Sequence, residues 1–507
     1  MRSGVPRFAF GAGGAIVTVA TARAALFTRR HQATYAISSE ECSLKIVTIN
    51  PATGRKLREY DAAEKTQVTE AVAQARKAFN AWRQRPPNER GKILAEIGKM
   101  LRGRDRELGT IMTEEMGKTI KESVSEVRKC AGTFEYFAEH GEEFLKPEKV
   151  ETDADVSYVA FEPLGVVACI MPWNFPLWQL TRFAAPTLAG GNTTVFKPSS
   201  VTPETGLRLQ SVLSAAGLPN GCFLTLIGDY RLGTLMIEAQ TDAGSFTGSV
   251  AAGAKIAELA ARHLKKFVLE LGGSDPFIVL DDADVEIASE AAVAGRFINC
   301  GQSCIAAKRF FVHREVASRF VEEFVERTAK LKVGDPMSEQ TDLGPLVRED
   351  ALDNLERQVR ESVAQGAKVA TGGKRIDREG FFYAPTVLQD VKGTMPVMQE
   401  ETFGPVAPVM IVRDEAEAVE AANASEFGLG ASIWTSDIQR GESLVKHVRA
   451  GVVTVNNVVV SDPRVPFGGI KKSGIGRELS RYGMLEFTNI KVVRAYKKTP
   501  AATVGHG

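Results

Sequence analysis

The sequence has almost no net charge. Its 63 lysine and arginine residues are balanced by 62 aspartate and glutamate residues, which leaves a formal charge of +1. A chain with this balance creates no field that would draw it to nucleic acid or to an anionic lipid surface. We therefore expect neither a nucleic acid nor a stable membrane partner.

The chain also lacks paired cysteines and histidine motifs. Its six cysteines are scattered over 507 residues without a Cys-x-x-Cys pair. This spacing argues against a disulfide framework and against a zinc knuckle, so reduced thiols and no metal site are expected. The six histidines lie in no recognisable motif. They give no support to a hydrolase that pairs cysteine with histidine.

Acidic residues are absent from the first 39 positions, which contain five arginines among alanine, threonine and glycine. This composition is typical of a transit peptide, and we expect residues 1–44 to be an N-terminal extension. A disordered or mis-started extension, a secretory signal and a marginal membrane anchor are the alternatives. The expected location is mitochondrial in a eukaryotic cell and cytoplasmic otherwise.

After residue 45, helical and strand patterns alternate along the chain. Helical spacing of apolar residues predicts helices at 61–82, 89–108, 111–144 and 316–331. Short apolar runs predict strands within 156–170 and at 193–196, 223–227, 243–246, 266–269, 276–280, near 369, at 407–412 and at 452–455. This alternation is typical of an α/β fold with a mostly parallel, doubly wound sheet. Two glycines at 272 and 273 indicate a domain break within 271–274.

A thiol and a carboxylate are the best candidates for chemistry. Cys304 follows Gly301 and Gln302, which are expected to leave the sulfur at a tight turn near backbone N–H groups that can hold an oxyanion. Glu270 ends an apolar strand before two glycines, so burial is expected to raise its pKa and make it a general base. A buried apolar filler is the alternative for any lone cysteine.

Three segments have features of a nucleotide site. The segment with Gly248, Ser249 and Gly253 follows a strand and opens a helix, so its N–H groups and hydroxyl could receive a pyrophosphate. Lys197 lies at a strand end, where open sheets bind ligands. Asn174 lies in a proline-bracketed aromatic loop, where its amide must satisfy backbone groups or donate to a ligand. A solvated strand end and a structural loop are the alternatives for the last two.

Taken in order, these motifs resemble those of the aldehyde dehydrogenase superfamily from residue 46 to residue 496. The motifs are Pro172-Trp173-Asn174-Phe175-Pro176, the strand end at Lys197, the turn from Gly248 to Gly253, Glu270-Leu271-Gly272-Gly273, Gly301-Gln302-Ser303-Cys304, Glu400 to Pro405, and Pro466 to Lys471. Segments 176–179, 274–279 and 476–480 are most similar to those of bacterial-type succinate-semialdehyde dehydrogenases.

The resemblance implies NAD(P)-dependent oxidation of an aldehyde to a carboxylic acid. Cys304 would form a thiohemiacetal whose oxyanion is held by the Asn174 amide and the Cys304 N–H, and Glu270 would activate the water that hydrolyses the thioester. The implied coenzyme contacts are Trp173 and Ser249 with the pyrophosphate, Lys197 with the adenosine ribose, and Glu401 with Phe403 at the nicotinamide ribose.

The resemblance also implies a domain plan. It comprises a Rossmann-like doubly wound coenzyme domain (45–144 and 164–270), an α/β catalytic domain (271–475) and a small β oligomerisation arm (145–163 and 485–497). The arm would assemble a homodimer or a homotetramer.

Two departures from the family pattern concern specificity. Ser200 stands where many NAD-preferring relatives have glutamate, and the loss of that carboxylate opens the site to NADP as well as NAD. Arg182 matches one of two arginines that clamp a distal carboxylate in some relatives, whereas Ile298 replaces the other. Ser461 or Arg464 could take its place, so a small anionic aldehyde, most of all succinate semialdehyde, is the expected substrate.

Several readings remain open at this point. Glutarate semialdehyde or a neutral aliphatic aldehyde is an alternative substrate, and an inactive nucleotide-binding structural protein is an alternative class. Cys300, four residues before Cys304, is expected to be a buried small residue, with a reversible Cys300–Cys304 disulfide as the alternative.

Overall fold

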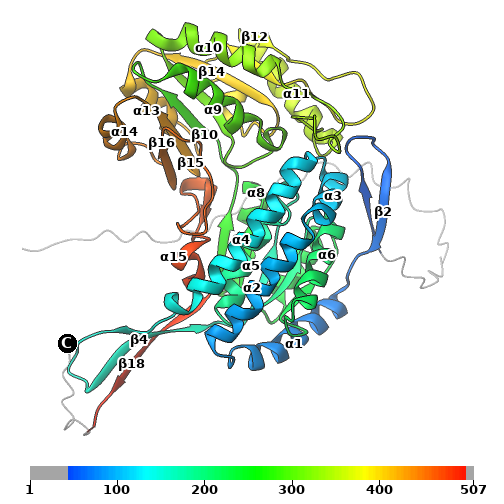
Figure 1. Cartoon of the computed structure of the whole chain (residues 1–507), viewed down its shortest axis with the longest axis vertical. Coiled ribbons are helices and arrows are strands. Elements are labelled where there is room, and N and C mark those ends of the chain that lie inside the picture. The colour runs from blue at the N-terminus through cyan, green and yellow to red at the C-terminus, as the bar shows by residue number, and fades with distance from the viewer. Residues whose placement is uncertain (1–43, 498–507) are drawn as a thin grey trace, which may run out of the picture. The chain divides into compact units, whose positions relative to one another are not determined.

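A computed structural model describes residues 44–497, and the transit-peptide prediction lies outside these residues apart from residue 44. Figure 1 shows two α/β bodies of this segment, each built on its own sheet. The α/β fold with mostly parallel sheets is confirmed. Within 44–497, no helix has both the length and the apolar character required to cross a membrane.

The first body contains a six-stranded sheet with the order β17-β9-β8-β5-β6-β7. Its strands are β5 (Val166–Ile170), β6 (Thr193–Lys197), β7 (Phe223–Thr225), β8 (Ala243–Thr247), β9 (Lys266–Glu270) and β17 (Gly474–Ile475). All pairs are parallel except β17 with β9. Every residue of β5, β6 and β8 is buried, as expected for a parallel sheet covered on both faces.

Eight helices of the described chain surround this sheet. They are α1 (Lys65–Trp82), α2 (Pro87–Gly103), α3 (Asp105–Met116), α4 (Ile120–Phe144), α5 (Trp178–Ala189), α6 (Pro203–Ala215), α7 (Tyr230–Glu238) and α8 (Val250–Arg262). The predicted boundaries at 89–108 and 111–144 were wrong, because these segments form three helices. Gly117 ends α3 in the left-handed region at φ 83°, and Thr119 then caps α4 by accepting a hydrogen bond from the Glu122 N–H.

The second body contains a seven-stranded sheet with the order β12-β13-β14-β11-β10-β15-β16. Its strands are β10 (Asp275–Val279), β11 (Ala307–His313), β12 (Lys368–Thr371), β13 (Thr386–Gln389), β14 (Val406–Val412), β15 (Gly430–Trp434) and β16 (Val452–Val455). Its helices are α9 (Val285–Phe297), α10 (Arg314–Ala329), α11 (Glu349–Ala364), α12 (Pro396–Gln399), α13 (Glu415–Asn423) and α14 (Ile438–Val445). The short helix α15 (Ser480–Leu485) packs against α4 and α5 of the first body. The predicted break at 271–274 lies between β9 and β10.

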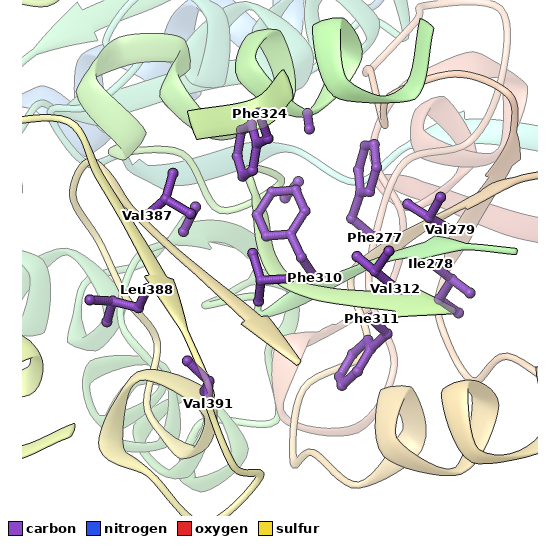
Figure 2. Packing of buried hydrophobic residues seen from close by; sticks show 14 of the residues in the cluster. Phe277, Ile278, Val279, Phe310, Phe311, Val312, Phe324, Val387, Leu388 and Val391 are labelled. Atoms are coloured by element: carbon purple, nitrogen blue, oxygen red, sulfur yellow. The ribbon is translucent and has the colours of Figure 1, made fainter. Parts of the chain in front are cut away.

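Aromatic residues fill the core of this second body. In Figure 2, Phe277 of β10 and Phe310 of β11 lie on the same side of the sheet as Phe324 of α10, whereas Phe311 points to the other side. The ring centroids of Phe310 and Phe324, and those of Phe277 and Phe310, are 5.1 Å apart. The alternation along β11 therefore supplies both faces of the sheet.

Two small sheets complete the described chain. One is the hairpin of β1 (Lys45–Ile49) and β2 (Lys56–Asp61), and the other joins β3 (Glu148–Lys149), β4 (Val156–Pro163) and β18 (Thr488–Ala495). β4 and β18 pair in register over their full length and extend together from the first body (Figure 1). The segments expected to form the arm thus pair with one another, and their role in assembly stays a prediction.

Candidate active site

Cys304 follows a tight turn after the 3-10 segment Ile298–Gly301. Gly301 has φ +73°, and a Cβ there would lie 2.3 Å from the Gly404 carbonyl oxygen, so the turn requires glycine. The Lys308 ammonium fixes the turn by donating to the carbonyl oxygens of Ser303 (2.6 Å) and Cys304 (2.7 Å). The predicted tight turn is present, and it leaves Cys304 only partly buried.

Cys300 is buried in the hydrophobic core of the second body. Burial raises the pKa of its thiol, which makes it a poor nucleophile. This environment corresponds to the expected buried small residue and offers no support for a disulfide switch.

Asn174 is tied directly to the turn that carries Cys304. Its Nδ2 donates to the Gln302 carbonyl oxygen (3.1 Å), and its Oδ1 accepts from Gln179 Nε2 (2.9 Å). The Asn174 carbonyl oxygen accepts from Asn299 Nδ2 (2.7 Å). These bonds fix the amide beside Cys304 and leave its second N–H without an acceptor among the described residues, so it is available to a ligand.

Glu270 is a buried carboxyl at the end of β9, and neither of its oxygens has a hydrogen-bond partner among residues 44–497. Burial raises its pKa well above the ordinary value, and the nearby Glu478 carboxylate raises it further. The charges of Arg182 and Arg477 lower it in part. Glu478 is itself buried and forms an ion pair with Arg182 (2.8 Å). Glu270 therefore has the free lone pairs and the raised pKa expected of a general base.

Burial also raises the pKa of the Cys304 thiol, to about 11. The positive charges of Arg182 and Lys308 lower it, whereas the carboxylates of Glu401 and Glu270 raise it. The thiol is therefore mostly protonated at neutral pH in the protein alone.

Cys304 lines two cavities. The smaller cavity, of about 230 Å³, brings together six of the residues expected to contact the coenzyme or the oxyanion. These are Trp173, Asn174, Gly248, Ser249, Glu401 and Phe403. Three expected coenzyme residues do not line it: Lys197, Ser200 and Gly253.

The residues of the smaller cavity fit a nicotinamide dinucleotide. Ser249 caps α8, whose first N–H groups can bind a phosphate. The Glu401 carboxylate accepts from the Gly273 N–H (3.0 Å) and can accept further from ribose hydroxyls. The Thr247 hydroxyl is buried without a hydrogen-bond partner among the described residues and also lines this cavity. A Cβ on Gly272 would lie 2.5 Å from Glu401 Oε2, so glycine is needed for the carboxylate to reach this position.

The residues outside the smaller cavity have other environments. Lys197 is buried at the end of β6 and donates to the Pro198 carbonyl oxygen (3.0 Å), and burial lowers its pKa to about 8. Ser200 lies in the turn that follows. Gly253 lies in the first turn of α8, where a Cβ would be 2.4 Å from the Leu271 side chain, so this glycine serves helix packing.

The larger cavity has a volume of about 350 Å³ and lies between α4, α5 and the segment 458–461. Arg182 and Ser461, two of the three expected substrate residues, line it together with Cys304. Arg464 does not line it. Its guanidinium is held by Asp462 through bonds of 2.8 and 2.5 Å and is exposed, so its predicted place beside the substrate is not supported.

The aldehyde dehydrogenase family model matches residues 37–493 of the chain. The chain belongs to the aldehyde dehydrogenase family. It is accordingly an NAD(P)-dependent oxidoreductase that acts on aldehydes, and the resemblance predicted from its motifs is confirmed.

Individual relatives agree with this family assignment. This aldehyde dehydrogenase is 45% identical over 451 residues to a probable succinate-semialdehyde dehydrogenase [NADP(+)] of Synechocystis, and the matched region covers 89% of this chain and 99% of that protein. A solved succinic semialdehyde dehydrogenase of Streptococcus pyogenes in complex with NADP+ is 34% identical with a TM-score of 0.87, covering 89% of this chain and 100% of that one. A Bacillus cereus aldehyde dehydrogenase in complex with NAD+ is 33% identical with a TM-score of 0.87, covering 90% and 94%.

Three residues near the site of this aldehyde dehydrogenase received no role from the sequence. Glu478 lies in a motif that carried the resemblance, but its pairing with Arg182 depends on the fold. Lys308 lies in β11, which the sequence did not predict, and nothing in the sequence indicates its contact with the Cys304 carbonyl oxygen. Lys129 lies on α4, 332 positions from the Ser461 hydroxyl to which it donates. No local pattern could have found this last contact.

Proposed function

We propose that this aldehyde dehydrogenase oxidises succinate semialdehyde to succinate and uses NADP, with NAD as an accepted alternative. The observation that carries the proposal is the larger cavity, which exposes the Cys304 thiol to a space also lined by Arg182 and Ser461. The cations that line this space, together with the Ser461 hydroxyl, suit a substrate with a distal carboxylate, because desolvating a carboxylate without such partners is costly. The relatives named for this activity support the same substrate.

In this proposal Cys304 is the nucleophile. It reacts as the thiolate, so its raised pKa requires that its proton be removed before the attack on the aldehyde carbon. The Asn174 amide and the Cys304 backbone N–H hold the oxyanion of the thiohemiacetal. A nicotinamide coenzyme in the smaller cavity supplies the hydride acceptor. Glu270, with both carboxylate oxygens free, removes a proton from the water that hydrolyses the thioester.

Coenzyme choice in this proposal rests on Lys197 and Ser200. Ser200 presents no carboxylate to repel a 2′-phosphate, and Lys197 supplies a positive charge at the same strand end. The name of the Synechocystis relative specifies NADP(+), which agrees with this preference.

We also propose that β4 and β18 mediate assembly into a homodimer or homotetramer. Val156, Ile490 and Val492 on these strands are exposed apolar residues, which a partner subunit would cover. The acid-free composition of residues 1–39 supports a mitochondrial location in a eukaryotic cell, with the cytoplasm as the location otherwise.

The test is a steady-state assay of purified protein with succinate semialdehyde, glutarate semialdehyde and butanal, each with NADP and with NAD, followed at the nicotinamide absorbance. We expect the highest kcat/KM with succinate semialdehyde and NADP. A higher kcat/KM with butanal or with glutarate semialdehyde would reject the proposed substrate.

A further inference from the structure

Lys129 brings a positive charge into the larger cavity from α4. Its Nζ donates to the Ser461 hydroxyl oxygen (3.1 Å) and lies 3.9 Å from the centroid of the Trp178 ring. Trp178 Nε1 donates to the same Ser461 oxygen (2.9 Å). All three residues line the cavity that also exposes Cys304.

Each of the other two cations of this cavity forms an ion pair with a carboxylate. Arg182 pairs with the buried Glu478 carboxylate (2.8 Å), and Lys121 pairs with Asp342 (2.8 Å). Lys129 forms no ion pair with a carboxylate within residues 44–497. Of the cations that line the larger cavity, it is the one that forms no ion pair within residues 44–497 and so has its full charge to offer to an anion.

Two carboxylates, those of Glu126 and Asp462, lie near enough to raise the pKa of Lys129, but each is bound to other groups. Glu126 pairs with the buried Lys118 and also accepts from two backbone N–H groups of the α5 entry, while Asp462 holds Arg464. Burial and the charge of Arg182 lower the pKa of Lys129 to about 8, the direction expected for a cation that lacks a counter-ion.

Ser461 is set to act with Lys129. Its oxygen accepts two hydrogen bonds, from Lys129 and Trp178, which occupy both lone pairs. Its own O–H must therefore point elsewhere and is free to donate. A carboxylate bound at this place would meet the Ser461 O–H and the Lys129 ammonium, which together supply one neutral and one charge-assisted hydrogen bond.

We propose that Lys129, acting with Ser461, binds the distal carboxylate of the substrate and sets the preference of this enzyme for an ω-carboxy aldehyde. This inference rests on the proposed function. Ile298 lines the same cavity at the position where some relatives have the second carboxylate-binding arginine, and its apolar side chain supplies no positive charge. Lys129 supplies a positive charge to this cavity from α4 instead.

The test compares succinate semialdehyde with butanal, which has the same carbon number and no carboxylate. For Lys129→Met we expect the ratio of kcat/KM for the two substrates to fall by about 10- to 100-fold, with most of the change in the KM of succinate semialdehyde. Lys129→Arg keeps the cation and should retain the ratio within about fivefold. Arg128→Met is the matched control, because Arg128 is the adjacent α4 cation, paired with Asp105 and outside the cavity.

NADP binding and thermal unfolding of each variant report whether it is folded. If Lys129→Met lowers kcat/KM equally for both substrates, the residue acts through packing against Trp178 and the inference is overturned. An unchanged ratio of the two kcat/KM values in Lys129→Met also overturns it. So does a fall of this ratio in Lys129→Arg as large as that in Lys129→Met. If the wild-type enzyme itself prefers butanal, the proposed substrate fails as well. A wild-type preference for succinate semialdehyde with no response at Lys129 overturns the inference alone.

Discussion

Removal of the Asn174 amide tests the assignment of the oxyanion site. Asn174 is buried, and one N–H of its Nδ2 is taken by the Gln302 carbonyl oxygen at 3.1 Å. The second N–H is the donor that we assign to the oxyanion. Loss of one donor of this kind lowers kcat by about 10²- to 10³-fold, or about 2.7–4 kcal/mol of transition-state stabilisation. We expect this loss for Asn174→Ala.

The same substitution has a separate cost in stability. Gln179 Nε2 loses its acceptor at 2.9 Å, and a buried donor left without a partner costs about 1–3 kcal/mol. The Gln302 carbonyl oxygen keeps the bond from Asn299 Nδ2 (3.2 Å), so it adds little. The free energy of unfolding should therefore decrease by about 1–3 kcal/mol, the cost of the Gln179 amide without its acceptor.

Asn174→Asp separates the two effects. The carboxylate keeps an acceptor for Gln179 but has no N–H, so kcat should fall at least as far as in Asn174→Ala while the orphaned Gln179 donor is avoided. Rapid-mixing measurement of the first turnover gives the rate of coenzyme reduction, and denaturant unfolding gives stability. A first-turnover rate within about threefold of wild type in Asn174→Ala, or recovery in Asn174→Asp, would refute the assignment.

Three further predictions concern the thiol, the base and the coenzyme. Because burial raises the pKa of Cys304 to about 11, alkylation of this thiol by iodoacetamide should accelerate about tenfold per pH unit from pH 7 to 10. Cys304→Ala serves as the blank, and a rate that reaches a plateau by pH 8 would contradict the raised pKa. Glu270→Gln should slow thioester hydrolysis more than the first hydride transfer, so that a burst of reduced coenzyme precedes a slow steady state, and equal loss in both steps would contradict its role as the hydrolytic base. Ser200→Glu should raise the Kd of NADP relative to that of NAD by about tenfold or more, measured by fluorescence titration, and an unchanged ratio would remove Ser200 from the coenzyme site.

Local patterns predicted those parts of the site that depend on neighbouring residues. The ends of β6 and β9 were predicted at Lys197 and Glu270 because apolar strands there meet proline or glycine. The turn before Cys304 was predicted from Gly301, whose left-handed conformation no other residue adopts as easily. In each case the residue that indicates the strand end or the turn lies within a few residues of it.

β11 was not predicted, because its sequence carries two charges inside a buried strand. Lys308 and Arg309 are both buried in β11. Lys308 donates to the carbonyl oxygens of Ser303 and Cys304 just before the strand and pairs with the distant Glu401 carboxylate (3.3 Å). Arg309 donates to the Ser274 carbonyl oxygen (2.9 Å), so both cations have partners from distant segments. A pattern of apolar residues cannot reveal a strand whose charged side chains find partners, such as the Glu401 carboxylate and the Ser274 carbonyl group, that only the folded chain brings close.

Whether Arg464 or Lys129 binds the substrate carboxylate also depends on contacts that only the folded chain creates. Arg464 and Ser461, on the same loop, were the candidates to replace the missing second arginine. In the fold, Asp462 neutralises Arg464, since a carboxylate two residues away is always at high local concentration. Lys129 is far from Ser461 in the chain but donates to it directly, and no carboxylate within 44–497 forms an ion pair with it. Proximity in the sequence therefore favours Arg464, the cation that is already paired with a carboxylate. A substrate carboxylate should instead bind Lys129, which is not. The change in kcat/KM for succinate semialdehyde in Lys129→Met decides between the two.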